Sequence, residues 1–509
     1  MLNLAHFLDE TAVKKPGHIA AKLDDLELTY GQLAAMARKT ANMLRSLGVA
    51  KGDKVAMMIP NTPHFPIIYY GILQCGAVVV PVNVLFQEDE IRHYLADSDA
   101  KVFLVFKMFE EQGRKAFQKV EGCGHLLVVS TPGDTSQPEV GENFMRLMAG
   151  AEDTFDTVQT MPDDTAVILY TSGTTGAPKG AELTHFNMFF NAYYAAREII
   201  QAGPEDVALV TLPLFHSFGQ TCLMNASIIA GVTMTMLPRF ETEKAMQVIA
   251  RDKVTMIALV PTMYFFILSN ERWADYDFSS VRVAISGGAA LPEEVHRRFH
   301  ERYGITVQEG YGLSETSPVA SFTMSGEEVR VGSIGRPIWG VEMRIIRDDG
   351  TFAEQGEVGE IVIRGHNVMK GYLNNPKATA SAIVDGWFHT GDVGKQDEAG
   401  YFYIIDRKKD LIIRGGMNIY PREIEEVLYQ HPKVREASVV GLPDLARGEE
   451  VKAYVSPKDG QTLTPDEIIE YLQSRTARYK WPKEVEVMED LPKGPTGKIL
   501  KRELKLRES

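Results

Sequence analysis

Short apolar runs alternate with longer amphipathic segments along most of the chain. Runs such as KVAMMIP from Lys54, TAVILYTS from Thr165 and VRVAIS from Val281 predict buried strands. The segment GQLAAMARKTANMLRSLG from Gly31 spaces its apolar residues as an amphipathic helix does. This rhythm of strand and helix predicts an α/β protein with largely buried parallel sheets.

The pattern changes at about Gly332. Short alternating strands separated by turns follow, as in VEMRIIRDDGTF from Val341 and GEIVIRG from Gly359. We therefore expect a large N-terminal domain that contains two parallel-type α/β sheets and, in addition, a small β-rich subdomain.

Charge indicates a separate C-terminal unit. From Arg407 onward the chain carries 20 basic and 18 acidic residues, a net charge of +2, against −16 for the residues before that point. Its pattern of short helices and strands predicts a compact α+β unit joined to the rest at DRKKD, Asp406 to Asp410. We predict domains at 1–406 and 407–509.

Composition narrows the function. The net charge of −14 argues against a protein that binds nucleic acid through bulk phosphate attraction, so a polyanionic ligand would need local cations. Only Cys75, Cys123 and Cys222 occur, which predicts neither a disulfide framework nor a thiolate metal site. The N-terminus MLNLAHFLDE lacks the basic segment of a secretory signal, and we expect a cytoplasmic protein.

Two long uncharged stretches, Val55 to Phe86 and Val207 to Pro238, raise the question of a membrane span. Prolines interrupt the first, and Pro213, His216 and Gln220 interrupt the second. Buried helices and strands explain both stretches better than a transmembrane helix does. We expect no integral membrane segment.

The stretch YTSGTTGAPKG, Tyr170 to Gly180, has almost no side-chain volume to bury. It follows an expected strand and combines glycines, hydroxyl side chains and one lysine, which is the chemistry of a phosphate-binding loop. The position of Lys179 differs from that of the Walker loop lysine, which disfavours a kinase or motor ATPase.

This stretch resembles the signature loop of the adenylate-forming superfamily, which includes acyl-CoA synthetases, luciferases and the adenylation domains of peptide synthetases. The resemblance spans almost the whole chain. It continues, in the order of the family, through LTYGQLA at Leu28, PLFHSFG at Pro213, SGGAALP at Ser286, EGYGLSET at Glu309, GWFHTGD at Gly386, DRKKDLIIRGGMNIYPREIE at Asp406 and GPTGKIL at Gly494.

The resemblance implies a set of residues that bind MgATP. The phosphates would contact Thr171, Ser172, Gly173, Thr174, Thr175, Gly176 and Lys179. Thr171 and Glu315 would hold Mg²⁺, a hard cation that takes few protein carboxylates when it bridges phosphates. Ser314 stands where many members of the family carry threonine, so the hydroxyl is retained.

The nucleoside would lie on a second group of residues. The adenine would lie on Gly288, Ala289, Glu309, Gly310, Tyr311 and Gly312, with Tyr311 stacked on the base. Asp392 and Arg407 would hold the ribose hydroxyls as acceptor and donor.

The C-terminal unit is expected to move. The resemblance implies that Lys498 stabilises the charge that develops when a carboxylate attacks the α-phosphate, without a covalent role. Lys409 falls at the hinge position of the family, and Gly415 and Gly416 would line the path of the CoA thiol. The predicted catalytic residues are thus Lys179, His216, Glu315 and Lys498.

The acid pocket would be built by His216, Phe218, Met224, Thr262, Tyr311 and Gly312. The segments that follow PLFHSFG and surround PTMYFF are aromatic or soft and bring no lysine or arginine, so a second carboxylate would be buried unpaired. We therefore predict an acyl-CoA synthetase for a medium- or long-chain fatty acid, with a cinnamate-like aryl acid as second choice.

Two other classes of function stay open. An adenylation module could serve a carrier protein instead of CoA, although the sequence shows no fused carrier domain. A nucleotide-binding protein without catalysis would not need Lys498 and Glu315. We expect the partners to be a small carboxylic acid, ATP, Mg²⁺ and CoA, and the sequence leaves open whether the chain forms a homodimer.

Overall fold

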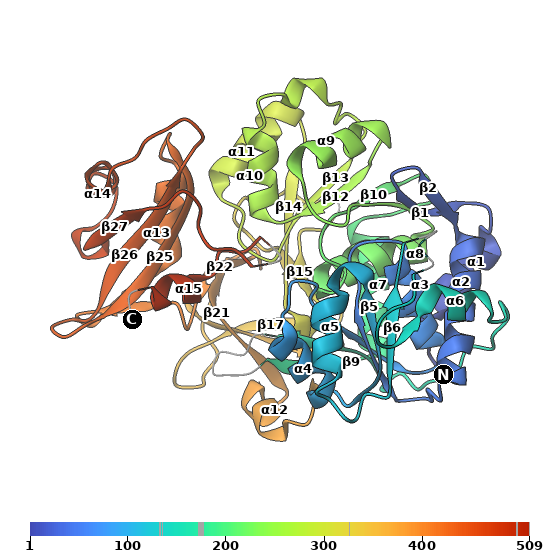
Figure 1. The fold of residues 1–509 in the computed structure, drawn as a ribbon. Helices are drawn as coiled ribbons and strands as arrows, with labels where there is room; N and C mark the ends of the chain where they lie inside the picture. Colours follow the sequence, from blue (N-terminus) through green and yellow to red (C-terminus); the bar gives the residue numbers. More distant parts are fainter. Residues whose placement is uncertain (132–133, 135, 172–177, 325, 495–496, 508–509) are drawn as a thin grey trace.

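The computed structural model describes the chain except for residues 132–133, 135, 172–177, 325, 495–496 and 508–509. It has a large N-terminal domain and a smaller C-terminal unit at one side of it (Figure 1). A loop of the C-terminal unit, just before the last helix, reaches across to the large domain. The predicted α/β class with a small α+β unit at the C-terminus is confirmed.

The first α/β sheet carries the strand that ends at the glycine-rich loop. In the described residues it has eight strands, whose central members run parallel, while β8, β9 and β19 pair antiparallel at one edge. The expected strands at Lys54 and Thr165 are both present. In spatial order the strands are β19 (Gly371–Tyr372), β9 (Lys179–Thr184), β8 (Thr165–Thr171), β4 (Val78–Pro81), β3 (Lys54–Met58), β5 (Ala100–Phe106), β6 (His125–Val129) and β7 (Glu142–Asn143).

The second sheet carries the other motifs of the large domain. Its central strands are parallel, and β14 turns back into β15 as an antiparallel pair. The described strands, in spatial order, are β16 (Arg336–Pro337), β15 (Val319–Phe322), β14 (Val307–Gly312), β13 (Val283–Ser286), β12 (Met256–Leu259), β10 (Val207–Val210), β11 (Thr233–Met236), β1 (Ile19–Leu23) and β2 (Leu26–Thr29).

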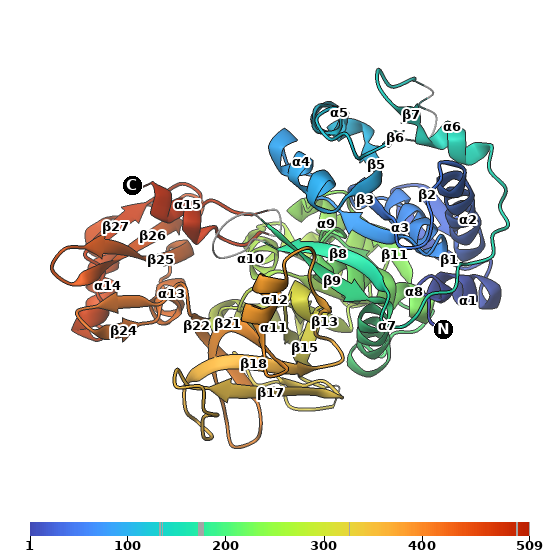
Figure 2. The same ribbon diagram turned by 90° about the horizontal axis from the view of Figure 1, so that it is seen from below.

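Helices cover and connect these two sheets (Figure 2). Helix α2 begins where expected, because Thr29 and Gln32 form a capping box at its N-terminus, and it buries one face that includes Leu33, Ala37 and Leu44. The helices of the large domain are α1 (His6–Lys14), α2 (Tyr30–Ser46), α3 (His64–Gln74), α4 (Glu88–Asp97), α5 (Glu110–Phe117), α6 (Phe144–Ala149), α7 (His185–Tyr194), α8 (Ala226–Ala230), α9 (Thr242–Arg251), α10 (Pro261–Ser269), α11 (Glu293–Tyr303) and α12 (Pro376–Ala382).

Short helical turns complete the domain. Two of them are π-helical, and one of these, η3, follows directly on the PLFHSFG motif. A π-helical turn is uncommon and is often found at functional sites. These turns are η1 (Lys107–Phe109), η2 (Ala195–Ile199), η3 (Gly219–Asn225), η4 (Trp273–Asp275) and η5 (Ser314–Thr316).

The expected β-rich subdomain is an antiparallel sheet that packs beside the two larger ones. Its order is β17, β18, β21, β20, and β22 pairs with the other part of β21. The register places Asp392 opposite Arg407. The strands are β17 (Val341–Ile346), β18 (Gly359–Gly365), β20 (Ile383–Val384), β21 (Trp387–Gln396) and β22 (Phe402–Arg407).

The C-terminal unit has its own apolar core, to which Ile424, Val439 and Leu472 contribute. Arg407 is still part of β22, so the predicted boundary between 406 and 407 falls at the end of a strand of the β-rich subdomain. The elements of the unit are β23 (Ile412–Arg414), β24 (Met417–Ile419), α13 (Pro421–Tyr429), β25 (Val434–Asp444), β26 (Gly448–Pro457), α14 (Pro465–Gln473), η6 (Arg478–Lys480), β27 (Glu484–Val487) and α15 (Lys501–Leu506).

The two uncharged stretches are built into the interior. The first folds into β3, α3 and β4, and every residue of α3 is buried. The second folds into β10, η3, α8 and β11. Among the described residues, no helix is long and apolar enough to cross a membrane.

Candidate active site

The end of β8 meets the turn that carries Glu315. The hydroxyls of Thr171 and Tyr372 each donate a 2.9 Å hydrogen bond to the same carboxylate oxygen of Glu315. Glu315 is buried, so these two hydroxyls compensate part of the lost hydration of its charge. The two residues predicted to hold Mg²⁺ are therefore in direct contact.

The donor set at this point suits Mg²⁺. It consists of one carboxylate and hydroxyl oxygens, which are hard ligands, and Mg²⁺ in phosphate sites takes one or two carboxylates and completes its shell with phosphate oxygens and water. Among the described residues, no group of three or more His, Cys, Asp and Glu side chains could hold a metal alone. The arrangement fits a cation that arrives with its nucleotide.

Lys179 begins β9 on the other side of the glycine-rich loop. The β8–β9 pairing sets Lys179 opposite Thr171, and its ammonium lies 5.3 Å from the centre of the Tyr372 ring. One tyrosine thus contacts both Glu315 and Lys179. The predicted phosphate contacts at Ser172, Gly173, Thr174, Thr175 and Gly176 lie outside the described residues.

Tyr311, Asp392 and Arg407 form a second polar group. The Tyr311 hydroxyl donates to one carboxylate oxygen of Asp392 at 2.6 Å, and the Arg407 guanidinium lies 3.3 Å from the other oxygen. Burial and the Asp392 charge hold the pKa of Tyr311 well above its ordinary value, so this tyrosine stays a donor. These contacts hold together the residues predicted to bind the ribose and the base.

The glycines of EGYG are required by the protein itself. A Cβ on Gly312 would lie 1.8 Å from the carbonyl oxygen of Pro318, and one on Gly310 would lie 2.6 Å from the Phe322 ring. The β14–β15 turn therefore needs both. Gly288, at φ +79°, and Ala289 are exposed, and they are free to contact a nucleotide.

Glu309 is buried and has a structural partner. One of its carboxylate oxygens accepts a 3.0 Å hydrogen bond from the backbone N–H of Leu291, at the end of the SGGAALP motif. Burial raises the pKa of Glu309 to about 7. Its observed contact is thus with the loop that would hold the base, and a direct contact with the nucleotide stays a prediction.

The PLFHSFG motif lies against both nucleotide motifs. The Ser217 and Ser314 hydroxyls are 3.3 Å apart. The ring of Phe218 lies over Gly287, where an added Cβ would come within 2.9 Å of it. His216 accepts a 3.3 Å hydrogen bond at Nδ1 from the N–H of Phe218, which leaves Nε2 as the donor of its neutral ring.

His216 is neutral at physiological pH. Its pKa is lowered to about 4, first by burial and then by the nearby charge of Lys498. A neutral imidazole can donate a hydrogen bond to a carboxylate without adding charge. Among the other predicted pocket residues, Met224 is fully buried in η3, and Thr262 is half-buried near the start of α10.

Lys498 reaches this site from the C-terminal unit. Its pKa is lowered to about 8, first by burial and then by the charge of Arg407, while Asp392 and Asp410 act in the opposite direction. Its neighbours therefore come from β21, β22 and the PLFHSFG motif. The lysine predicted to act on the α-phosphate lies beside the residues predicted to hold the ribose.

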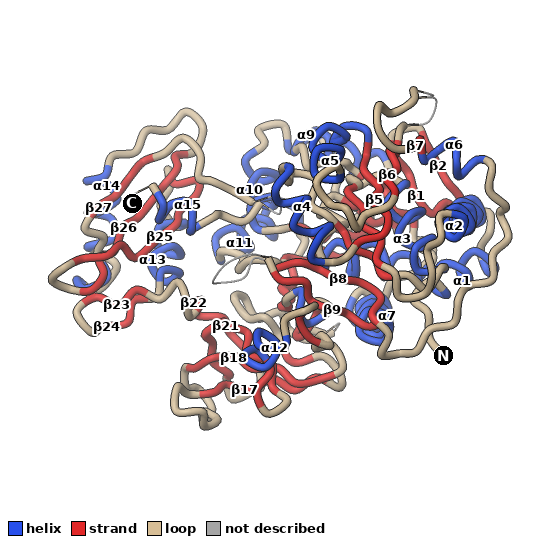
Figure 3. Tube along the Cα trace, turned by 60° about the horizontal axis from the view of Figure 1, so that its bottom comes forward, coloured by secondary structure: helices blue, strands red, loops and turns tan. Residues whose placement is uncertain are grey.

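Gly415 and Gly416 do not lie at this site. They form the exposed turn between β23 and β24, with φ of +58° and +81°. This hairpin pairs with β26 inside the C-terminal unit, on a side away from the large domain (Figure 3). Lys409 is exposed in the turn after β22. In this structure Lys498 is therefore near the candidate active site. Gly415 and Gly416, the glycines predicted to line the path of the CoA thiol, lie away from it.

Sequence reasoning missed two residues of the site, Tyr372 and Ser217, and one contact of the predicted residue Thr262. Tyr372 lies far from every recognised motif, and only the β9–β19 pairing brings it to Glu315. Ser217 is inside PLFHSFG, but its pairing with Ser314 depends on how the segments that follow β10 and β14 of the second sheet meet. The Thr262 hydroxyl donates to the carbonyl of Gly497 at 3.3 Å, a contact across 235 positions that no local pattern signals.

Comparisons with known proteins agree with this geometry. Residues 8–373 match the model of the family described as AMP-binding enzyme, and residues 423–498 match that of the AMP-binding enzyme C-terminal domain. The matched regions contain the Thr171–Glu315 and Lys498 parts of the site.

Individual relatives extend over nearly the whole chain. A long-chain-fatty-acid–CoA ligase of Bacillus subtilis is 38% identical, over 98% of this chain and 94% of its own. A feruloyl-CoA synthase of an Amycolatopsis species is also 38% identical, over 97% and 96%. The crystal structure of ATP-bound MatB from Rhodopseudomonas palustris matches with a TM-score of 0.90 and 31% identity, over 100% and 99%.

Proposed function

The chain belongs to the AMP-binding enzyme family, and we propose that it activates a medium- or long-chain fatty acid for transfer to CoA. The coarser activity, that of an AMP-forming acyl-CoA ligase which uses ATP, Mg²⁺ and CoA, follows from the family and the relatives. The nature of the acid is the proposal.

The reaction has two steps in which bonds balance. A carboxylate oxygen of the acid attacks the α-phosphorus of ATP, and pyrophosphate leaves. The thiol of CoA then attacks the acyl carbon of the adenylate, loses its proton, and AMP leaves. No covalent bond to the protein is required, so the residues of the chain act by binding, orientation and charge.

The observation that carries the proposal is the position of Lys498. It is close enough to Asp392, Arg407 and His216 for its charge to interact with these side chains, and this supports a role for Lys498 where the first step would develop negative charge. A lysine ammonium in a partly dry site stabilises such charge more strongly than it does in water. His216, neutral with a free Nε2–H, is suited to donate to the acid carboxylate.

Mg²⁺ would be held by Thr171 and Glu315, where it would supply charge neutralisation for the phosphates when bound. Tyr372 fixes the Glu315 carboxylate and also borders the Lys179 ammonium. We therefore expect these residues to contact the phosphates of ATP.

The residues around the predicted acid pocket favour an apolar acid. Phe218, Met224 and the apolar face of η3 are uncharged, and burying an unpaired second carboxylate among them would be costly. Each methylene buried there stabilises the complex by roughly 0.8 kcal/mol, which gives a long chain its advantage. The Bacillus relative named for long-chain fatty acids supports the same choice.

The experiment is an assay of AMP and pyrophosphate release over a panel of acids, with and without CoA. We expect the highest kcat/KM for saturated acids of eight or more carbons. Each additional buried CH₂ should stabilise the bound acid by roughly 0.8 kcal/mol. Short-chain acids and dicarboxylates should be poor substrates. Release of ADP and inorganic phosphate, or a preference for dicarboxylates, would contradict the proposal.

An aryl acid is the second candidate. The feruloyl-CoA synthase is as similar to this chain as the fatty-acid ligase is, and the aromatic Phe218 ring close to Gly287 could border a planar substrate. The same panel distinguishes the two, because an aryl-specific pocket would prefer cinnamate-like acids to alkyl acids of equal carbon number.

A further inference from the structure

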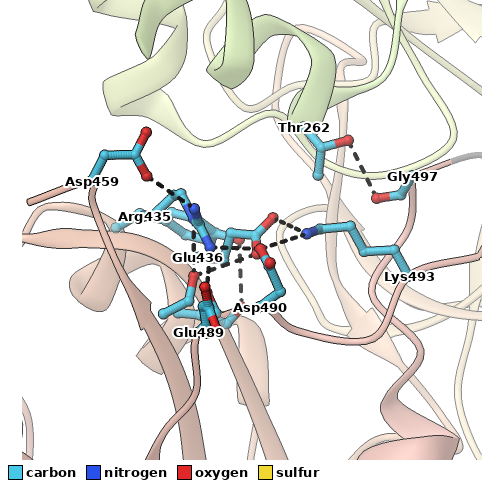
Figure 4. Close-up of polar contacts among 11 residues, drawn as sticks. Thr262, Arg435, Glu436, Asp459, Glu489, Asp490, Lys493 and Gly497 are labelled. Carbon is cyan, nitrogen blue, oxygen red and sulfur yellow. Dashed lines mark hydrogen bonds and ion pairs between the residues drawn. The ribbon is translucent and has the colours of Figure 1, made fainter. Parts of the chain in front are cut away.

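The turn that carries Lys498 is docked on helix α10 of the large domain. Lys493 and Ile499 form an antiparallel bridge, and the N–H of Gly494 donates to the carbonyl of Lys498 at 2.8 Å, so the described residues on the two sides of this turn pair with each other. At its tip, the carbonyl of Gly497 accepts the 3.3 Å hydrogen bond from the Thr262 hydroxyl (Figure 4). Lys498 is the next residue.

The contact at Gly497 is close. Gly497 has a φ of +78°, and a Cβ there would lie 2.7 Å from the Thr262 hydroxyl oxygen and 3.3 Å from Val260. Only glycine adopts this backbone conformation without strain and also admits the side chain of Thr262. The tip of the turn is therefore fitted to the start of α10.

A second contact lies one helical turn further along α10. The ammonium of Lys493 lies 5.7 Å from the centre of the Phe266 ring. Thr262 and Phe266 are four residues apart, so they share one face of the helix. Both ends of the turn thus meet the same face of α10.

The base of the turn is fixed in the C-terminal unit. Lys493 pairs with Glu436 at 2.9 Å, and Glu436 is 3% exposed on β25 (Figure 4). Arg435 beside it pairs with Asp490 at 2.6 Å and with Asp459 at 3.3 Å. Because the base of the turn is fixed in the C-terminal unit, a contact at its tip also restrains the orientation of the whole unit.

We propose that Thr262 is a positioning residue for the adenylation step, which acts through Gly497 to hold Lys498 in the site. This inference rests on the proposed role of Lys498, and it replaces the expectation that Thr262 serves the acid pocket. The contact joins the large domain to the C-terminal unit, so it should matter only while Lys498 is presented. The second step, for which Gly415 and Gly416 must approach, should not depend on it.

The charge state of Lys498 gives a readout that a packing defect would not change. Its lowered pKa of about 8 depends first on burial, and Arg407, Lys409, Asp392 and Asp410 contribute charges from the neighbouring elements, with His216 facing it. A turn that docks less firmly leaves Lys498 better hydrated. The pKa of Lys498 should then rise toward its ordinary value.

The test compares Thr262→Val, which removes the hydroxyl at nearly constant shape, with Thr262→Ser, which keeps it. Acid-dependent ATP–pyrophosphate exchange reports the first step, and conversion of supplied acyl-adenylate to acyl-CoA reports the second. For T262V we expect a 3- to 10-fold loss of the first rate, about the value of one hydrogen bond, and an unchanged second rate. T262S should recover most of the loss.

The profile of kcat/KM for ATP against pH completes the test. In T262V its alkaline limb should move to higher pH, and the preference among acids should stay that of the wild type. Equal losses in both steps, an unmoved limb, or a changed acid preference in T262V would overturn the inference.

A second variant approaches the contact from the other side. Gly497→Ala should also lower the first rate selectively, and the loss in the double variant with T262V should be smaller than the product of the single losses, because both remove one contact. Multiplicative losses would argue that the two residues act independently. If Lys498→Ala keeps the wild-type rate of ATP–pyrophosphate exchange, the proposed role of Lys498 is wrong. If K498A abolishes exchange and T262V leaves it intact, only the inference about Thr262 is wrong.

Discussion

The hydroxyl of Tyr311 donates a 2.6 Å hydrogen bond to Asp392, and this bond joins β14 of the large parallel sheet to β21 of the β-rich subdomain. Asp392 is 4% exposed and uses its other oxygen for Arg407. A residue that would lie against the base thereby fixes the carboxylate that would bind the ribose. The two halves of the nucleoside site are set by one contact.

Replacing Tyr311 by Phe should weaken ATP binding. The buried Asp392 would lose a donor, and a hydrogen bond to a charged group is worth roughly 1.5–3 kcal/mol. We expect KM for ATP to rise about tenfold, with a smaller effect on KM for the acid. Steady-state kinetics with each substrate varied would show this, and Tyr193→Phe on the exposed part of α7 is the matched control. An unchanged KM for ATP would show that Tyr311 is not part of the nucleoside site.

Gly312→Ala should destabilise the protein. The added Cβ would meet the carbonyl of Pro318 at 1.8 Å, a backbone atom that cannot move aside alone. Overpacking of this kind costs roughly 2–4 kcal/mol, so the melting temperature should fall by several degrees. Gly203→Ala, where nothing lies within 4 Å of the added Cβ, should leave it unchanged. Equal melting temperatures for both variants would contradict the close approach of β14 and Pro318.

Larger residues in the predicted pocket should shorten the preferred acid. Phe218→Trp and Met224→Trp fill space in which an acyl chain would lose roughly 0.8 kcal/mol of stabilisation per excluded CH₂. The profile of kcat/KM against chain length should move to shorter acids in both variants. Phe186→Trp on α7, outside the predicted pocket, should keep the profile of the wild type. If neither pocket variant changes the chain-length profile, Phe218 and Met224 are not part of the acid pocket.

Adenylation should have an alkaline limit set by Lys498. Its pKa is lowered to about 8, so the charged form that stabilises the phosphate is present below pH 8 and is lost as the pH rises through that value. kcat/KM for ATP should therefore fall above pH 8. Lys498→Arg, whose charge persists, should remove that limb even if the rate is lower.

His216 should give no acid limb. Its pKa is lowered to about 4, so the ring stays neutral between pH 5 and 9. Any inflection of the wild-type profile between pH 5.5 and 7.5 should therefore persist in His216→Asn, since Glu309, with its pKa of about 7, titrates in that range and His216 does not. An inflection near pH 6.5 that disappears in His216→Asn would contradict the neutral, buried imidazole.

Much of this site could be predicted from the sequence because its motifs are local. YTSGTTGAPKG follows a strand as expected, and EGYGLSET places Tyr311 and Glu315 on one strand and the turn after it. The family resemblance placed Asp392, Arg407 and Lys498 in one site although they come from three separate segments. Their proximity in the structure agrees with that expectation.

The contacts that the sequence could not predict depend on how separate elements meet. Tyr372 reaches Glu315 only because β19 adds to the edge of β9. The π-helical turn η3 lies in an apolar stretch whose composition carries no helical period. The bond between Thr262 and Gly497 depends on the orientation of the whole C-terminal unit, which no segment encodes alone.

The proposed separation of the two reaction steps depends on the orientation of the C-terminal unit. The turn from Arg407 to Asp410 is closed by a 2.9 Å hydrogen bond from the N–H of Asp410 to the carbonyl of Arg407, and Lys409 lies within it. Proline at 409 would restrict the backbone there and that of Lys408 as well. Lys409→Pro should therefore slow the second step more than the first, while Lys409→Ala, which keeps backbone freedom, should slow neither as much.

The most direct measurement compares the two half-reactions in Lys498→Ala. Adenylate formation from acid and ATP should lose roughly 2–4 kcal/mol of transition-state stabilisation, about 30- to 1,000-fold in rate. Conversion of supplied acyl-adenylate and CoA to acyl-CoA should continue at the rate of the wild type, with an unchanged melting temperature. Equal loss of both half-reactions would contradict the separation of the two steps between two orientations of the C-terminal unit.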